Sequence, residues 1–284
     1  MRQQVENIAE IRIFLRELKR FSPYDFCDYS DSSIFRRVNK IMVDNNMDMD
    51  QMIERVRTDS TFTECIVQDI TVNTTEFFRD PEIWNDLYEN YQRMLKNKKT
   101  INIWHAGCSS GQEVYSNLIL LNELGLLERS SVIATDLNNR MLNIARTGIY
   151  SHKYNKTFNE NINKVLSKKG LPNGININKY FEISLEDESI KVKDFLRKKP
   201  VFKYHDLVKD DTADIKFDII FCRNVLIYFN SSLQARILRK FHKNLVNRGM
   251  LVLGNHEGLN GFYKAKFSKD GPVFIKNNAY SFQF

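Results

Sequence analysis

The chain has 284 residues, of which 42% are hydrophobic, enough for one large or two small packed domains. Its longest apolar runs, 219–222 and 225–227, are far shorter than a membrane span, and residues 1–10 lack a secretory signal's hydrophobic block. Cys27, Cys65, Cys108 and Cys222 are scattered, which indicates buried thiols in a reducing cytosol and excludes a disulfide framework or zinc site. A cytoplasmic protein is expected.

The formal net charge of +7 raises the question of a nucleic-acid partner. Residues 1–79 contain more acidic than basic side chains, and the remaining excess of lysine and arginine is spread over several segments. No basic repeat interleaved with aromatic residues is present. We therefore expect no nucleic-acid binding, while an acidic protein partner stays open.

Residues 1–72 are predicted to form a small all-α domain. Apolar residues recur at helical spacing in four segments. These are 5–20, a segment that begins after an N-cap at Asp31 or Ser32, 49–56 and 62–70. Such short helices can bury their apolar faces only against one another. The exposed face of the second helix contains Arg36, Arg37 and Lys40, which by themselves indicate only a solvated helix surface.

Residues 73–98 are predicted to be a linker and a connecting helix. The segment 72–79 has no helical stripe, and Asp80-Pro81 then supplies a cap and a first-turn proline for a helix to about Lys96.

The segment 101–116 predicts the first strand, turn and helix of an open α/β sheet. Ile101, Ile103 and Trp104 form a short buried strand, Gly107 and Gly111 allow a sharp turn, and a helix continues from Glu113 to Leu124. The spacing matches neither G-x-G-x-x-G nor the Walker motif. A smaller nucleoside cofactor such as S-adenosylmethionine (SAM) fits better, although any α/β protein can contain such a turn.

A second strand, 131–135, ends in Asp136, where a carboxylate can bind ribose hydroxyls or cap the next helix, or do both. Residues 153–169 indicate a basic amphipathic helix. Alternating residues over 180–204, including Val201 to Tyr204, predict an inserted antiparallel β-subdomain at about 178–205. Further strands are expected at 217–222, 250–253 and 273–276, with a helix over 233–245. An Asn277-Asn278 turn would lead into a last strand, 279–284.

Four ordered motifs resemble those of the CheR-type chemotaxis receptor methyltransferases: 73–79 (NTTEFFR), 107–116 (GCSSGQEVYS), 134–136 (ATD) and 221–229 (FCRNVLIYF). The segment 254–257 (GNHE) is a weaker form of a fifth. The resemblance covers most of the chain. It implies a Rossmann-like, SAM-dependent methyltransferase domain over 99–284 whose sheet ends in an antiparallel hairpin.

The resemblance also implies an activity, the transfer of a methyl group from SAM to glutamate side chains of chemoreceptor cytoplasmic helices, without a metal. Arg79 and Tyr228 would lie nearest the reacting methyl. Glu113 would bind the amino group of SAM and Asp136 its ribose. The other implied cofactor-binding residues are Asn73, Thr75, Arg79, Gly107, Asp206, Leu207, Asn224 and Val225. Because methylated receptor helices are acidic, Arg36, Arg37 and Lys40 become candidates for substrate docking. A monomer without membrane insertion is expected.

Four residues depart from the family pattern: Gln112, Val114, Asp206 and His256. None removes a group with a chemical role, so an active enzyme is expected. A non-catalytic SAM-binding adaptor and a methyltransferase with another substrate are the alternatives. The connection 184–189 is short, acidic and free of glycine, unlike the hairpin loop of members that bind a receptor tail. It favours a receptor interaction without such a tether.

Overall fold

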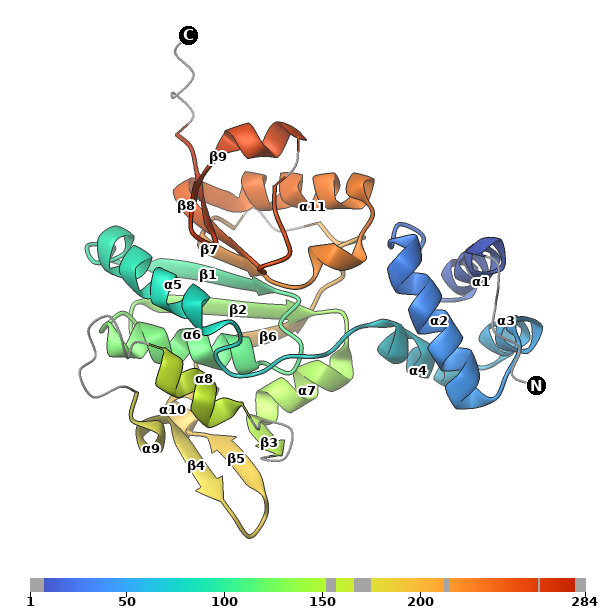
Figure 1. Cartoon of the computed structure of the whole chain (residues 1–284), viewed down its shortest axis with the longest axis horizontal. Helices are drawn as coiled ribbons and strands as arrows, with labels where there is room; N and C mark the ends of the chain where they lie inside the picture. The colour runs from blue at the N-terminus through green and yellow to red at the C-terminus, as the bar shows by residue number, and fades with distance from the viewer. Residues whose placement is uncertain (1–7, 152–156, 166–174, 212–214, 260, 279–284) are drawn as a thin grey trace. The chain divides into compact units, whose positions relative to one another are not determined.

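A computed structural model describes residues 8–151, 157–165, 175–211, 215–259 and 261–278. The chain divides into two compact units, shown in Figure 1. The first comprises residues 1–72, 208–210 and 225–237, and the second comprises 73–207, 211–224 and 238–284.

The first unit is built from four helices, α1 (Ile8–Phe21), α2 (Asp31–Asn45), α3 (Met49–Thr58) and α4 (Ser60–Ile70). Each helix buries one apolar face, and α1 contacts α3 while α2 contacts α4. The short 3₁₀ helix η2 (Leu226–Tyr228) and the start of α11 (Ser231–Asn244) join this unit. Phe229 packs edge-on against Tyr29, with ring centroids 5.0 Å apart.

Caps mark the helix ends more sharply than apolar spacing does. Asp48 and Gln51 form a capping box at α3, and the Asp59 side chain accepts the Phe62 amide at α4. The N-cap expected at Asp31 or Ser32 is wrong by one or two residues, because Ser30 occupies that position without a side-chain cap bond.

The second unit contains a seven-stranded sheet in the order β6-β2-β1-β7-β8-β10-β9. The first five, β6 (Val201–Tyr204), β2 (Ser130–Asp136), β1 (Ile101–Ala106), β7 (Phe217–Cys222) and β8 (Leu245–Leu253), are parallel. The last two, β10 (Val273–Lys276) and β9 (Phe267–Asp270), form an antiparallel hairpin. This confirms the predicted open α/β sheet that ends in an antiparallel hairpin.

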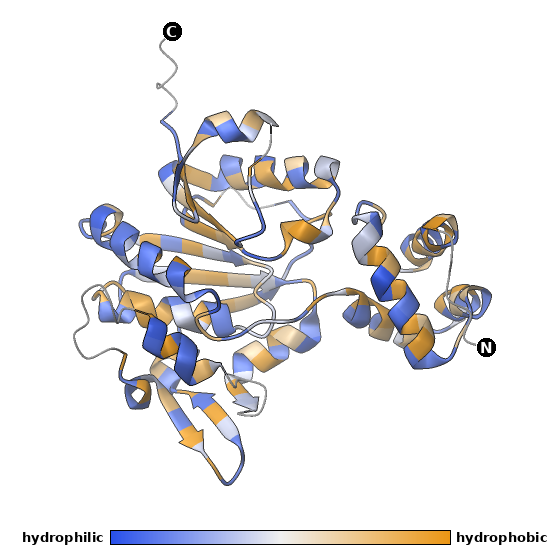
Figure 2. Ribbon diagram, viewed as in Figure 1, coloured by the Kyte–Doolittle hydropathy of each residue, from blue (hydrophilic) through white to orange (hydrophobic). Residues whose placement is uncertain are grey.

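The core of this unit lies between the sheet and its helices. Helices α5 (Pro81–Met94), α6 (Gln112–Glu123) and α7 (Asn139–Thr147) contribute buried residues such as Trp84, Leu118 and Leu142. All six residues of β7 are buried, as expected for an inner parallel strand. Figure 2 shows apolar colours along the strands of this sheet.

The inserted subdomain differs from the prediction. Its three-stranded sheet has the order β3-β5-β4 and uses β3 (Ile149–Ser151), β5 (Ser189–Val192) and β4 (Phe181–Ser184). Figure 1 shows the β4–β5 hairpin projecting from the larger sheet. Val201 to Tyr204 is instead strand β6, parallel to β2 at the edge of that larger sheet. Alternation is common to both kinds of edge strand, so it could not identify the partner.

Three short helices, α8 (Phe158–Lys164), α9 (Ile177–Tyr180) and α10 (Asp194–Arg197), surround this subdomain. The basic helix expected over 153–169 corresponds to α8, which begins at Phe158 and ends at Lys164 and is therefore shorter than predicted.

The terminal hairpin also differs. Its turn lies between β9 and β10, where Gly271 has φ of +60°, and the 3₁₀ helix η3 (Gly261–Lys266) precedes it. β10 already pairs with β8 on one side and with β9 on the other, and Asn277 and Asn278 form no turn, so the hairpin predicted there is wrong. The last predicted strand, 279–284, falls outside the residues that the structure describes.

Of the helices described, none is both long and apolar enough to cross a membrane. All four cysteines are free; Cys108 and Cys222 are buried, but Cys65 is exposed, contrary to the sequence interpretation.

Candidate functional site

The predicted cofactor residues follow neighbouring strands of the sheet. β6, β2, β1 and β7 are parallel, so their carboxyl ends lie at one edge. Asp206 and Leu207 follow β6, Asp136 ends β2, the glycine turn follows β1, and Asn224 follows β7. Asp206 and Leu207 are both buried. Ligands of open α/β sheets bind at this edge.

The turn after β1 is a compact loop with three left-handed residues, Gly107 (φ +79°), Ser109 (φ +49°) and Gly111 (φ +90°). The amides of Gly107 and Cys108 donate to the Thr135 carbonyl at 2.8 and 2.9 Å. The Ser109 hydroxyl donates to the Asn73 carbonyl at 3.1 Å. The loop therefore joins the 73–79 segment to the end of β2.

Asp136 accepts the Ser109 amide at 2.7 Å on one carboxyl oxygen and the Asn138 amide at 2.9 Å on the other. Burial raises the pKa of this carboxyl, although its backbone hydrogen bonds oppose the shift. The N-cap of α7 is Asn138, so the alternative in which Asp136 caps that helix is wrong. Each carboxylate oxygen keeps further acceptor capacity, which suits ribose hydroxyls.

Glu113 lies in the first turn of α6 with a side chain 15% exposed. One carboxylate oxygen is 2.9 Å from His105 Nδ1, and the other accepts from Arg223 at 3.2 Å. Burial acts to raise the pKa of Glu113, but the His105 hydrogen bond and the Arg223 charge outweigh it and hold that pKa below its ordinary value. Glu113 is therefore an ionised carboxylate at neutral pH.

Arg223 is a site residue that the sequence interpretation missed. Its side chain is 1% exposed and also donates to Asp80 Oδ2 at 2.7 Å and to the Arg79 carbonyl at 3.0 Å. Asp80 has φ of +56° and is the N-cap of α5 with Pro81 in the first turn, as predicted, but its side chain makes no cap bond and pairs with Arg223 instead. An arginine directly after a buried strand was the available signal.

Arg79 lies between two left-handed residues, Phe78 (φ +51°) and Asp80. Its guanidinium donates to the Thr74 carbonyl at 3.2 Å, while Phe77 and Phe78 are fully buried. Non-glycine residues in this conformation cost energy and persist where the surroundings impose them, often at functional sites. Anchored on both sides, the Arg79 backbone is fixed.

Asn224 has φ of +59°, and Glu257 holds it in place. Glu257 Oε2 accepts the amides of both Asn224 and Gly254 at 2.7 Å. A Cβ at Gly254 would lie 2.9 Å from Asn224 Oδ1. The weaker 254–257 motif therefore supports Asn224, whereas its departing residue His256 is exposed.

The other departures fit the fold. Gln112 is buried and accepts the Ser110 hydroxyl at 2.8 Å, and Val114 lies in the core.

Among the remaining predicted site residues, Thr75 is partly buried. Val225 and Tyr228 belong to the first unit, where the Tyr228 carbonyl accepts the Ser30 amide at 2.8 Å. Arg36, Arg37 and Lys40 are on α2 of that unit, and Lys40 pairs with Asp44. Their roles remain predictions.

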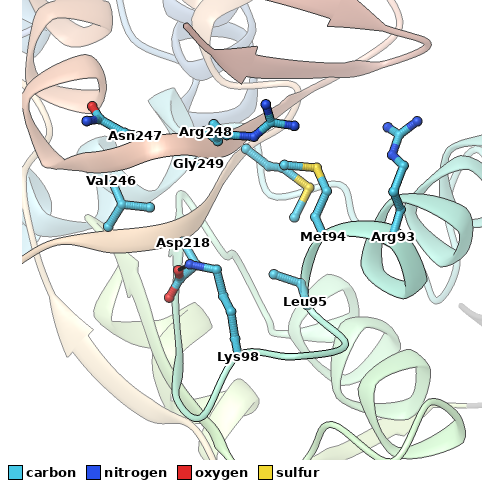
Figure 3. A pocket seen from close by; sticks show the side chains of 10 residues that line it. Arg93, Met94, Leu95, Lys98, Asp218, Val246, Asn247, Arg248 and Gly249 are labelled. Carbon is cyan, nitrogen blue, oxygen red and sulfur yellow. Dashed lines mark hydrogen bonds and ion pairs between the residues drawn. The ribbon is translucent and has the colours of Figure 1, made fainter. Parts of the chain in front are cut away.

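A separate pocket of about 300 Å³ lies at the opposite end of β7. Its lining includes Asp218, Lys98, Met94 and Arg248, and Figure 3 shows Lys98 beside Asp218. Because Asp218 is near the start of β7 and Arg223 follows its end, this pocket is not part of the site. Among the residues described, no three His, Cys, Asp or Glu side chains gather as a metal site.

Gly111→Ala is expected to destabilise the protein by about 2–4 kcal/mol and to weaken SAM binding. The residue has φ of +90°, and a Cβ would lie 2.9 Å from that of Ala145. Urea unfolding measures the loss. Gly258→Ala is the control, because a Cβ there meets nothing within 4 Å; equal stability of the two variants would contradict a tightly packed turn.

Residues 73–272 match the family model described as CheR methyltransferase, SAM binding domain. The chain is 34% identical over 251 residues to a Pseudomonas putida methyltransferase named Cher3, covering 88% of this chain and 89% of that one. It is 35% identical over 201 residues to chemotaxis protein methyltransferase 1 of Vibrio cholerae, covering 69% and 68%. It is 31% identical to chemotaxis protein methyltransferase Cher2 of P. putida, covering 79% and 81%. The chain therefore belongs to the CheR methyltransferase family and contains that family's SAM-binding domain.

Proposed function

We propose that this protein transfers the methyl group of SAM to glutamate side chains of chemoreceptor cytoplasmic helices, forming glutamate methyl esters. Relatives named chemotaxis protein methyltransferases support a role in chemotaxis. The main structural support is Arg79, whose backbone carbonyl accepts from Arg223, the arginine that also contacts the Glu113 carboxylate. A guanidinium whose backbone is held beside a cofactor site suits an anionic acceptor.

The residues present fit SAM. Its amino-acid part has a cationic amine and an anionic carboxylate, and Glu113 and Arg223 offer one group of each complementary charge. Arg223 Nε is buried without a hydrogen-bond partner among the described residues and is free to donate. Asp136 has acceptor capacity for ribose hydroxyls. When bound, SAM supplies an electrophilic methyl group on a sulfonium.

The chemistry requires positioning more than activation. A glutamate carboxylate is already ionised at neutral pH, so no strong general base is needed. Arg79 would hold that carboxylate in line with the methyl, and Tyr228 would border it. Burial raises the pKa of both Cys108 and Cys222, so these nearby thiols stay protonated and do not compete as nucleophiles.

Methyl transfer from labelled SAM to purified receptor cytoplasmic domains tests the substrate class. We expect label in receptor protein and none in added DNA or RNA. SAM binding without transfer would indicate an adaptor, and label in nucleic acid would indicate a different substrate.

We expect charge reversal at Arg36 and Arg37 to slow receptor methylation about tenfold at low salt and to flatten its salt dependence. Arg36 is exposed and Arg37 partly buried on α2, whereas Lys40 is partly neutralised by Asp44. Lys96→Glu with Lys99→Glu is a matched control, since both lysines are exposed and the charge change is the same. The docking role fails if both double variants methylate the receptor equally.

We also expect methylation without a receptor tail tether. The turn between β4 and β5 exposes three acidic residues, Glu186, Asp187 and Glu188, which would repel an acidic tail. Lack of glycine is a weaker argument than the sequence suggested, because Glu188 itself has φ of +46°. Equal methylation of a receptor fragment with and without its last residues is the expected result. Saturable micromolar binding of the free tail peptide, with slower methylation of the shortened receptor, would contradict it.

A further inference from the structure

A continuous chain of buried polar side chains reaches Glu113 from the protein core. The Tyr91 hydroxyl on α5 is 2.8 Å from Asn117 Oδ1, and Asn117 Nδ2 is 3.1 Å from His105 Nε2. His105 Nδ1 is 2.9 Å from the Glu113 carboxylate. Tyr91, Asn117 and His105 are each 0% exposed.

The hydrogen bonds define the direction of the chain. Burial raises the pKa of Tyr91, so its hydroxyl keeps the proton that it donates to Asn117 Oδ1. Asn117 then presents its amino group to His105 Nε2, which must accept. The remaining imidazole nitrogen, Nδ1, bears the hydrogen and donates it to Glu113. His105 thus accepts from Asn117 at Nε2 and donates to Glu113 at Nδ1.

The fold holds this imidazole rigidly. His105 on β1 pairs in register with Phe221 on β7, and the two rings stack with centroids 4.2 Å apart and planes 9° apart. Glu113 and Asn117 are four residues apart on α6, so they face the same side of the helix and contact the two imidazole nitrogens. An imidazole held at both nitrogens and on one face can impose one orientation on the carboxylate.

Burying three polar groups side by side costs stability unless every one is satisfied, and an apolar cluster would fill the same space without that requirement. The chain ends on a carboxylate whose other oxygen contacts Arg223. We propose that His105, oriented by Asn117 and Tyr91, is a positioning residue that fixes the Glu113 carboxylate for recognition of the SAM amino group. This inference rests on the proposed role of Glu113 in binding that group.

The test compares two ligands by calorimetry: S-adenosylhomocysteine, and 5′-methylthioadenosine, which lacks the amino-acid part. His105→Leu is expected to reduce the preference for S-adenosylhomocysteine about tenfold, while affinity for 5′-methylthioadenosine stays unchanged. A merely structural role would weaken both ligands alike, and that result would overturn the inference. His242→Leu is the matched control, because His242 also packs against aromatic rings, Tyr263 and Phe267. It should leave the preference unchanged.

Glu113→Gln separates this inference from the function on which it rests. We expect it to lower the preference at least tenfold, and His105→Leu to add nothing in that background, since His105 acts through Glu113. An unchanged preference in Glu113→Gln would refute the role of Glu113 itself. A lowered preference there, with parental preference in His105→Leu, would refute only the positioning role.

Two milder variants keep the test decisive if His105→Leu does not fold. His105→Asn retains an N–H near the Nδ1 position and should recover most of the preference. Tyr91→Phe removes only the hydroxyl that orients Asn117, and we expect a two- to threefold loss of preference. Parental preference in Tyr91→Phe would show that the chain does not act as a unit.

Discussion

Arg79→Ala should lower methyl-transfer turnover by about 100-fold or more while changing SAM affinity only a few-fold. The guanidinium is expected to hold the acceptor carboxylate in a fixed, two-point geometry that a water-filled gap cannot reproduce. Arg79→Lys should recover little, because an ammonium retains the charge but not the planar fork. The left-handed residues on either side keep the backbone in place, so the loss is chemical and not a collapse of the loop.

Single-turnover methylation and calorimetric SAM binding together measure this effect. Arg93→Ala is the control, since Arg93 lies on α5, pairs with Asp270 and lines the separate pocket at the opposite end of β7. If Arg79→Ala reduced turnover and SAM affinity by the same factor, Arg79 would be a cofactor ligand only.

Asp136→Ala is expected to weaken SAM binding by about 1.5–3 kcal/mol, or about 10- to 150-fold. The variant loses the proposed bonds to ribose and also leaves the Ser109 and Asn138 amides without their carboxylate acceptor. The lost amide bonds hold the glycine turn at Ser109 and the start of α7 at Asn138, both next to the proposed ribose contact, so affinity should fall more than overall stability.

Asp218→Ala is the matched control for this effect. Asp218 is also a carboxylate at an end of the same sheet; it accepts the Asn102 amide at 2.8 Å and pairs with Lys98. Its loss should lower the unfolding free energy and leave SAM affinity unchanged, because it lies at the opposite end of β7. Parental SAM affinity in Asp136→Ala would rule out the ribose assignment.

Local patterns in the sequence predicted the parts of the fold that depend on local chemistry. Gly107 and Gly111 identified the turn, and the buried run 217–222 identified an inner strand. The hairpin turn lies at Gly271, directly after Asp270, and not at Asn277-Asn278, in keeping with Asp-Gly being the stronger turn signal. Val201 to Tyr204 was misassigned because alternation does not reveal which strand lies alongside.

The site residues that were missed depend on strand order. His105 and Glu113 meet Phe221 and Arg223 because β1 lies beside β7, more than 100 residues later in the chain. Sequence spacing contains no information about that neighbour. For the same reason, the chain from Tyr91 through Asn117 to His105 could be recognised only after α5, α6 and β1 had been placed together.

The central claim is that this protein makes glutamate methyl esters on receptors, and base lability tests it most directly. Receptor cytoplasmic domain is incubated with methyl-labelled SAM, treated with mild alkali, and assayed for volatile methanol, alongside a receptor whose candidate glutamates are replaced by alanine. We predict alkali-released label from the parent receptor and none from the replaced one. Alkali-stable label, or equal labelling of both receptors, would contradict the account.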